Sequence, residues 1–176
     1  RSSGISVSFV LIFASFVVAF QTPPQRIVSL VPALTEMLYA IGAGPQVVAV
    51  SSYDEYPLEV KSLPRVGALL DPDTERIIAL RPDFVITYGS QVDLQAQMKR
   101  AGIPAFDYRH GGLNHILITI KDLGARTGHV SQAEKTVAAI EARLAGVRAR
   151  VAGKRRPRTL LLFSRQPNTL RNIYVS

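Results

Sequence analysis

Residues 71–89 read DPDTERIIALRPDFVITYG and contain a helix followed by a strand, the unit from which the architecture follows. Asp71 and Pro72 predict a helix start, because aspartate caps helices and proline fits the first helical position. The spacing predicts a helix over Asp73–Leu80, which ends before the next proline. The apolar run over Phe84–Thr87 predicts a buried strand.

The same alternation of helix and strand continues on both sides of this segment. It is typical of an α/β fold in which a mainly parallel sheet is flanked by helices on both faces. We therefore expect an α/β lobe over residues 25–129. Its other predicted strands are Arg26–Val31, Val47–Val50 and Ile103–Asp107, and its other predicted helices are Thr35–Ile41, Val92–Ala101 and a helix that Asn114 caps and that ends near Thr127.

A longer helix is predicted after this lobe. Ser131 and Glu134 have the spacing of a capping box, and apolar residues then recur every three or four positions to Val151. Twenty helical residues span about 30 Å, which suits a connection between two lobes. We expect this long inter-lobe helix over residues 130–152. The beginning of a second α/β lobe, cut short at its C-terminal side, is expected over residues 158–176, with a strand at Thr159–Phe163.

The first 22 residues have the composition of a targeting segment. Ile5–Phe20 carries no charge and follows Arg1. At about 24 Å of helix it is shorter than the ~30 Å hydrocarbon core of a bilayer. We expect residues 1–22 to be a signal peptide or an N-terminal anchor, with a buried core segment as the remaining alternative. Either of the first two interpretations makes the rest of the protein periplasmic or otherwise extracytoplasmic.

The net charge of +8 is concentrated near the C-terminus. Residues 1–142 contain 12 basic and 13 acidic residues, whereas residues 143–176 contain 9 basic residues and no acidic one. A nucleic-acid-binding domain usually spreads basic residues over a folded face, so we expect no nucleic-acid partner. A membrane-tethered interaction module using Arg148–Arg158 stays open as an alternative. The absence of cysteine excludes disulfides, cysteine-ligated zinc and thiol nucleophiles.

Groups that support catalysis or metal binding are sparse. The sequence has neither a GxxxxGK[ST] phosphate loop nor a GxSxG elbow. His110, His115 and His129 lack metal-ligand spacing, so we expect no metal site, although His110 could be a single ligand to haem iron. We expect no catalytic residue, and a secreted α/β enzyme is the alternative of another class. Asp54 and Glu55 are adjacent, and we expect both to be surface charges.

Three segments, in this order, resemble a known family. They are RIVSLVPALTEMLYAIGAG from Arg26, VVAVSSYDEYP from Val47, and the segment from Asp71 to Gly89. Together they resemble the substrate-binding proteins of ABC importers for cobalamin and ferric siderophores, and the Ser-Ser-Tyr-x-x-Tyr-Pro segment is most similar to the cobalamin-binding branch. The resemblance covers the chain from Gln25 to its end.

The resemblance implies two α/β lobes joined by one long helix, with the ligand in the cleft between them. It implies an extracytoplasmic protein that captures a corrinoid and delivers it to a membrane permease. A ferric siderophore or haem is the alternative ligand within the same family. The ligand would be cargo, so we expect no cofactor, and we expect a monomer that pairs with the permease.

The resemblance also suggests roles for individual residues. Tyr53 matches a tyrosine that packs against the corrin, and Tyr88 falls where an aromatic residue can stand on the cleft wall. Leu69 falls where a tryptophan can stand, which is a departure from the cobalamin branch. Glu75 matches a surface glutamate that docks onto arginines of the permease.

Further binding residues are expected from their places after predicted strands. In parallel sheets, ligands lie beyond the carboxyl ends of the strands. This rule places Pro32, Ala33 and Ser52 beside the ligand. It places Arg109 there as well, where a guanidinium could pair with a ligand carboxylate or phosphate.

Overall fold

The structure of the chain is a computed structural model that describes residues 22–160, 162–164 and 174–175. The expected signal or anchor segment lies outside the described residues, except for Thr22. Among the residues that are described, no helix is both long and apolar enough to cross a membrane. The chain divides into two compact units, with the boundary after Glu134.

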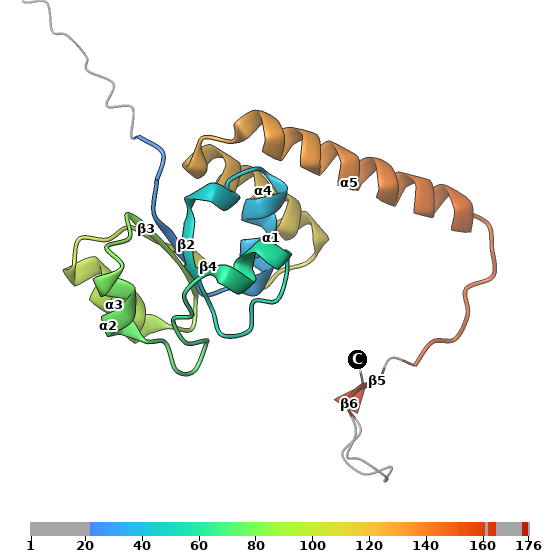
Figure 1. Cartoon of the computed structure of the whole chain (residues 1–176). Coiled ribbons are helices and arrows are strands. Elements are labelled where there is room, and N and C mark those ends of the chain that lie inside the picture. The colour runs from blue at the N-terminus through green and yellow to red at the C-terminus, as the bar shows by residue number, and fades with distance from the viewer. Residues whose placement is uncertain (1–21, 161, 165–173, 176) are drawn as a thin grey trace, which may run out of the picture. The chain divides into compact units, whose positions relative to one another are not determined.

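A four-stranded, entirely parallel sheet forms the centre of the first unit (Figure 1). The strand order is β2-β1-β3-β4, so β1 lies between the two strands that follow it in sequence. Tyr88 at the end of β3 pairs in register with Tyr108 at the end of β4. The α/β fold with a parallel sheet is confirmed. The strands are β1 (Ile27–Ser29), β2 (Val47–Val50), β3 (Phe84–Tyr88) and β4 (Ala105–Tyr108).

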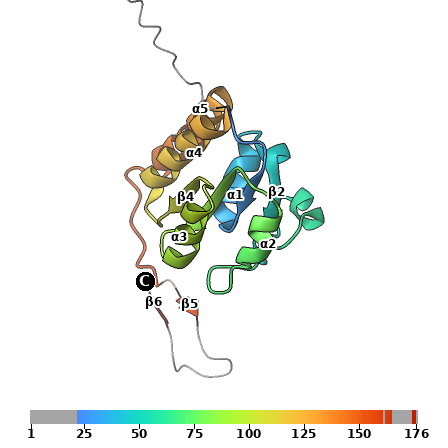
Figure 2. The same cartoon turned by 90° about the vertical axis from the view of Figure 1, so that its left-hand side faces the viewer.

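Helices cover both faces of the sheet, as the two perpendicular views show (Figures 1 and 2). Helices α1 (Pro32–Ala40) and α4 (Leu113–Thr127) contact each other on one face. Helices α2 (Thr74–Ala79) and α3 (Val92–Arg100) lie on the other. Two short 3-10 helices, Gly44–Gln46 and Leu58–Ser62, flank β2 in the sequence.

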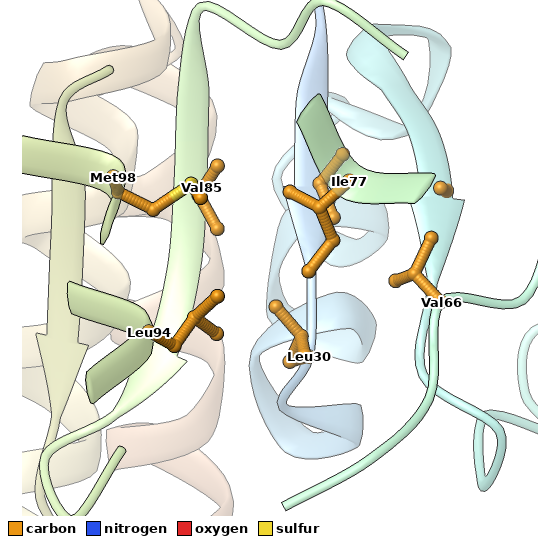
Figure 3. Packing of buried hydrophobic residues seen from close by; sticks show 8 residues of the cluster. Leu30, Val66, Ile77, Val85, Leu94 and Met98 are labelled. Atoms are coloured by element: carbon orange, nitrogen blue, oxygen red, sulfur yellow. The ribbon is translucent and has the colours of Figure 1, made fainter. Parts of the chain in front are cut away.

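The face beneath α2 and α3 contains a continuous apolar core (Figure 3). Ile77 from α2 and Met98 from α3 are fully buried against Val28 and Val85 of the central strands. Successive strand residues point to opposite faces, so Ser29 is directed to the other face. There its hydroxyl accepts a hydrogen bond from Thr35 Oγ1 of α1 at 2.9 Å.

Ile77→Val is expected to lower the free energy of unfolding by about 0.5–1.5 kcal/mol, because it removes one methyl group from this core. Urea unfolding of the full-length protein measures the change. Ile78→Val is the matched control, since Ile78 is the next residue and is 42% exposed; its effect should stay below about 0.5 kcal/mol. Equal losses from both variants would contradict the packing of α2.

The starts of two helices differ from the predictions. Helix α1 begins at Pro32 rather than Thr35, because the fixed φ of proline suits the first helical position. Helix α2 is capped by Asp73, whose carboxylate accepts a hydrogen bond from the backbone N–H of Arg76 at 3.0 Å. The prediction that Asp71 caps this helix was therefore wrong.

Two other predicted caps are also wrong. Helix α4 begins at Leu113, directly after the extended residue Gly112, so Asn114 lies inside the helix. Helix α5 (Val130–Val151) begins one residue before Ser131, which places that serine in the first turn instead of the capping position. The helices α4 and α5 lie close together near this start, because a methyl group at Gly124 would collide with Ala133.

Helix α5 is one uninterrupted helix of 22 residues, as the apolar spacing predicts. Its last apolar residues, Val147 and Val151, are 45% and 56% exposed. Strand β5 (Leu162–Ser164) begins three residues after the predicted Thr159 and pairs antiparallel with β6 (Tyr174–Val175). The division into a first lobe, an inter-lobe helix and a second lobe stays a prediction.

Candidate ligand-binding surface

The carboxyl ends of the parallel strands place the predicted binding residues along one edge of the sheet. Pro32 and Ala33 follow β1, and Ser52 and Tyr53 follow β2. Tyr88 ends β3, and Arg109 directly follows β4. Leu69 reaches the same edge through a later segment of the chain. Arg65 forms a parallel bridge with Val50, the last residue of β2, so the residues after Arg65 continue beyond the end of that strand. We call this set the carboxyl edge: Pro32, Ala33, Ser52, Tyr53, Leu69, Tyr88 and Arg109.

The tyrosines at the strand ends differ in how far their side chains are exposed to solvent. Tyr53 is 74% exposed and Tyr88 is half-buried, so both offer ring surface at the carboxyl edge. Tyr108, in contrast, is only 5% exposed and packs against the rings of His110 and His115. An exposed aromatic ring is rigid and loses little conformational entropy when it packs on a ligand. Tyr53 and Tyr88 therefore have the accessibility that a ligand contact requires, whereas Tyr108 is buried in the packing at the end of β4.

The loop after β2 is built around a buried carboxylate. Asp54 is 1% exposed, and its Oδ2 accepts hydrogen bonds from the N–H and the hydroxyl of Ser51, at 3.0 and 2.6 Å. Glu55 is exposed as expected, but the expectation that Asp54 is a surface charge was wrong. The physical reason is the tight turn, which directs the side chain of the fourth loop residue back toward the first.

Arg65 closes the same loop from the next segment of the chain. Its Nη1 donates to the backbone oxygens of Ser51 and Asp54, at 2.9 and 2.6 Å. The backbone N–H of Ser52 donates to the carbonyl oxygen of Gly67 at 2.8 Å. The loop that bears Tyr53 is thus bonded at several points to the segment that leads to Leu69.

A buried amide side chain connects the next two members of the carboxyl edge. Gln91 is 6% exposed; its Oε1 accepts from the N–H of Tyr88 at 2.9 Å, and its Nε2 donates to the carbonyl oxygen of Leu69 at 3.1 Å. One helical turn later, Gln95 Nε2 donates to the carbonyl oxygen of Tyr88 at 2.8 Å. Both backbone groups of Tyr88 are therefore fixed by glutamine side chains, one directly before α3 and one in its first turn.

Gln91 and Asp54 were not among the predicted site residues, although each left a signal in the sequence. Asp54 follows a serine by three positions in a loop of turn-forming residues, which is the spacing of a local side-chain-to-backbone turn. Gln91 and Gln95 are four residues apart at the start of a helix that follows a strand end, so they share one face of that helix.

Tyr88, Gly89, Arg109 and His110 line a shallow depression of about 370 Å³ at the ends of β3 and β4. Gly89 makes room for Arg109, because a Cβ at this position would lie 2.8 Å from Arg109 Cγ. The His110 ring lies 5.9 Å from the Tyr88 ring, measured between centroids. Partial burial raises the pKa of the Tyr88 phenol, and the charge of Asp54 adds to this effect. The phenol is therefore protonated at neutral pH and able to donate a hydrogen bond.

The carboxyl edge brings Tyr88 and Arg109 together but keeps Tyr53 apart from them. Strand β1 lies between β2 and β3, and two strand spacings amount to about 10 Å. Pro32 and Ala33, at the start of α1, follow the end of this intervening strand. This arrangement provides a long, partly aromatic surface that suits a broad ligand.

Glu75 and His129 belong to other parts of the unit, whereas His110 lies beside Tyr88. Glu75 is exposed in the first turn of α2. His129 is located at the start of α5, where its Nδ1 lies 2.9 Å from the carbonyl oxygen of Thr127. No group of three or more histidine, aspartate or glutamate residues within the described part of the chain could hold a metal ion.

Comparison with known proteins gives consistent matches over most of the chain. The family model described as periplasmic binding protein matches residues 27–176. A vitamin B12-binding protein of Pectobacterium carotovorum subsp. carotovorum (strain PC1) is 32% identical over 148 residues, which cover 82% of this chain and 54% of that protein. An uncharacterized ABC transporter substrate-binding lipoprotein of Bacillus subtilis (strain 168) is 33% identical over 132 residues, which cover 72% of this chain and 42% of that protein.

Solved structures match the fold equally well. The periplasmic vitamin B12 binding protein BtuF of Vibrio cholerae has a TM-score of 0.73 and 29% identity, over 82% of this chain and 57% of its own. The periplasmic heme-binding protein RhuT from Roseiflexus sp. RS-1, in its apo form, has a TM-score of 0.72 and 30% identity, over 89% of this chain and 59% of its own. The chain thus spans about half the length of the curated relatives that it matches.

Proposed function

Because the chain belongs to the periplasmic binding protein family, we propose that the full-length protein is the extracytoplasmic substrate-binding protein of an ABC importer. Its cargo is a corrinoid, held between the carboxyl edge of this lobe and a second lobe. It carries the cargo to the membrane permease and performs no chemistry on it. The vitamin B12-binding relatives and the similarity to a solved vitamin B12 binding protein support this proposal.

The single observation that carries the corrinoid assignment is the pair of accessible tyrosines on the carboxyl edge. A corrin is a broad, largely flat macrocycle with apolar faces, and exposed aromatic rings pack well against such faces. Tyr53 follows β2 and Tyr88 ends β3, with β1 between these two strands, so the two rings can contact different parts of one macrocycle. Pro32 and Ala33, which follow β1, are at least partly accessible.

Haem is the second candidate, and one specific contact favours it. The imidazole of His110 is exposed beside the Tyr88 ring, at the mouth of the depression that Arg109 also lines. An exposed imidazole can ligate haem iron, and a guanidinium can pair with a propionate. Solved heme-binding proteins of similar fold support this alternative, and a ferric siderophore is the third cargo to be tested.

Calorimetric titration of the full-length protein with cyanocobalamin, haem and a ferric siderophore tests the proposal. Saturable binding of cyanocobalamin with one site per chain is the expected result. Preferential binding of haem, lost in His110→Ala, would replace the corrinoid assignment with the haem assignment. Absence of binding with all three would contradict a role in the uptake of corrinoids or iron chelates.

A further inference from the structure

Asp54 is the least expected charged residue of this lobe. It lies in a surface loop between two exposed residues, Tyr53 and Glu55, yet its own side chain is almost completely buried. Burial of a carboxylate costs free energy that only hydrogen bonds and nearby positive charge can offset. Oδ1 of Asp54 is buried without a hydrogen-bond partner among the described residues, so the offset is incomplete.

The hydrogen bonds of Asp54 lead directly to Tyr53. The carboxylate can only accept, so the hydroxyl of Ser51 donates to Oδ2 of Asp54. The oxygen of the same hydroxyl is then free to accept, and it does so from the backbone N–H of Tyr53 at 3.2 Å. A chain of two hydrogen bonds thus runs from the Tyr53 backbone through Ser51 to the buried charge.

The loop is fixed on its other side as well. Arg65 Nη1 donates to the carbonyl oxygens of Ser51 and Asp54. The residues on both sides of Tyr53 are therefore anchored, whereas its ring extends into solvent. A contact residue whose backbone is ordered before binding loses less entropy when the ligand arrives.

From this geometry we infer that Asp54 is a positioning residue for the ligand contact of Tyr53, acting through the hydroxyl of Ser51. The inference rests on the proposed function, because it assigns Tyr53 to the contact with a flat macrocycle. Asp54 itself touches no ligand. Its role is to hold the turn from Ser51 to Asp54 in the conformation that presents the Tyr53 ring at the carboxyl edge.

A double-mutant cycle separates this role from a general loss of stability. In the full-length protein, Asp54→Ala should weaken cyanocobalamin binding about fivefold when Tyr53 is present. In the Tyr53→Ala background the same change should have no more than about a twofold effect, because no ring is left to position. Equal losses in both backgrounds would overturn the inference. Ser51→Ala provides a milder second variant, since it removes only the hydroxyl and should give the same non-additive result.

Glu55→Ala is the matched control. It removes a carboxylate of the same charge from the adjacent position, but from an exposed side chain. It should therefore leave the affinity and the cycle unchanged. A loss equal to that of Asp54→Ala would show that loop charge, rather than the buried hydrogen bonds, determines the effect.

Hydrogen exchange tests the same inference without a ligand. Asp54→Ala and Ser51→Ala should speed exchange of the Tyr53 amide at least about tenfold, while the amides of β2 keep their protection. Unchanged exchange at Tyr53 would overturn the positioning role. If the wild-type protein binds none of the three cargo molecules, the proposed function fails, and the exchange result still decides whether Asp54 holds the Tyr53 backbone.

Discussion

Tyr53→Ala is expected to weaken cyanocobalamin binding about 10- to 100-fold. The ring is 74% exposed in the free lobe, so a macrocycle packed on it would bury a large apolar area. Burial of an aromatic side chain contributes about 1.5–3 kcal/mol, and each 1.4 kcal/mol corresponds to a factor of ten in the dissociation constant. Calorimetry on the full-length protein measures the change.

Two further variants define what the Tyr53 ring contributes. Tyr53→Phe keeps the ring and should retain affinity within about threefold, because packing rather than the hydroxyl provides the contact. Tyr56→Ala removes a second tyrosine of the same loop, 64% exposed and outside the carboxyl edge, and should have little effect. Wild-type affinity in Tyr53→Ala would remove this residue from the binding surface.

Glu75→Ala is expected to reduce transport at least about tenfold while leaving the affinity for the cargo intact. The side chain is exposed in the first turn of α2. A helix that connects two parallel strands begins near the carboxyl end of the first strand, so Glu75 lies on the same rim of the sheet as the candidate binding residues. A carboxylate on this rim is placed to pair with arginines of a permease, where charge complementarity sets the orientation of docking. Uptake of labelled cobalamin in cells, together with calorimetry on the purified variant, measures both properties.

Asp93→Ala is the matched control for Glu75, because Asp93 is exposed in the first turn of the neighbouring helix α3. Both changes remove a carboxylate near a helix N-terminus. Each should lower the free energy of unfolding by about 0.3–1 kcal/mol. Only Glu75→Ala should impair uptake. Loss of cargo affinity in Glu75→Ala would assign this residue to the binding surface instead of the docking surface.

The position of the candidate residues along the sheet could be predicted because topology, rather than detailed packing, places strand ends. Once the strands are parallel, their carboxyl ends must share one edge of the sheet, so the residues after β1, β2, β3 and β4 lie along that edge whatever their side chains. Leu69 is placed less directly, because its position depends on the bridge between Val50 and Arg65. The roles of these residues stay predictions until binding is measured.

Errors in the predicted helix starts have a common physical cause. A cap depends on which side chain reaches a free N–H group, and Asp71 and Asp73 are both suitable by residue type. The backbone selects Asp73, because its N–H bonds to the carbonyl oxygen of Val66 and its carboxylate then reaches the N–H of Arg76. At α5, the carbonyl oxygen of His129 already accepts a hydrogen bond from the N–H of Ala133, so the helix begins before Ser131 and that serine lies inside its first turn.

The spacing of apolar residues along the chain was enough to predict the parallel α/β fold and the long helix, since it dictates which periodic structure can bury those residues. It also determined which residues follow the strands. The burial of Asp54 next to the exposed Glu55, and the link from Gln91 to Leu69, are visible only in the three-dimensional arrangement. Gln91 bonds to Leu69, 22 residues earlier in the chain, and Arg65 bonds to the backbone of Asp54 from 11 residues away. No local periodicity records such partners, although the bond between Asp54 and Ser51 is itself local.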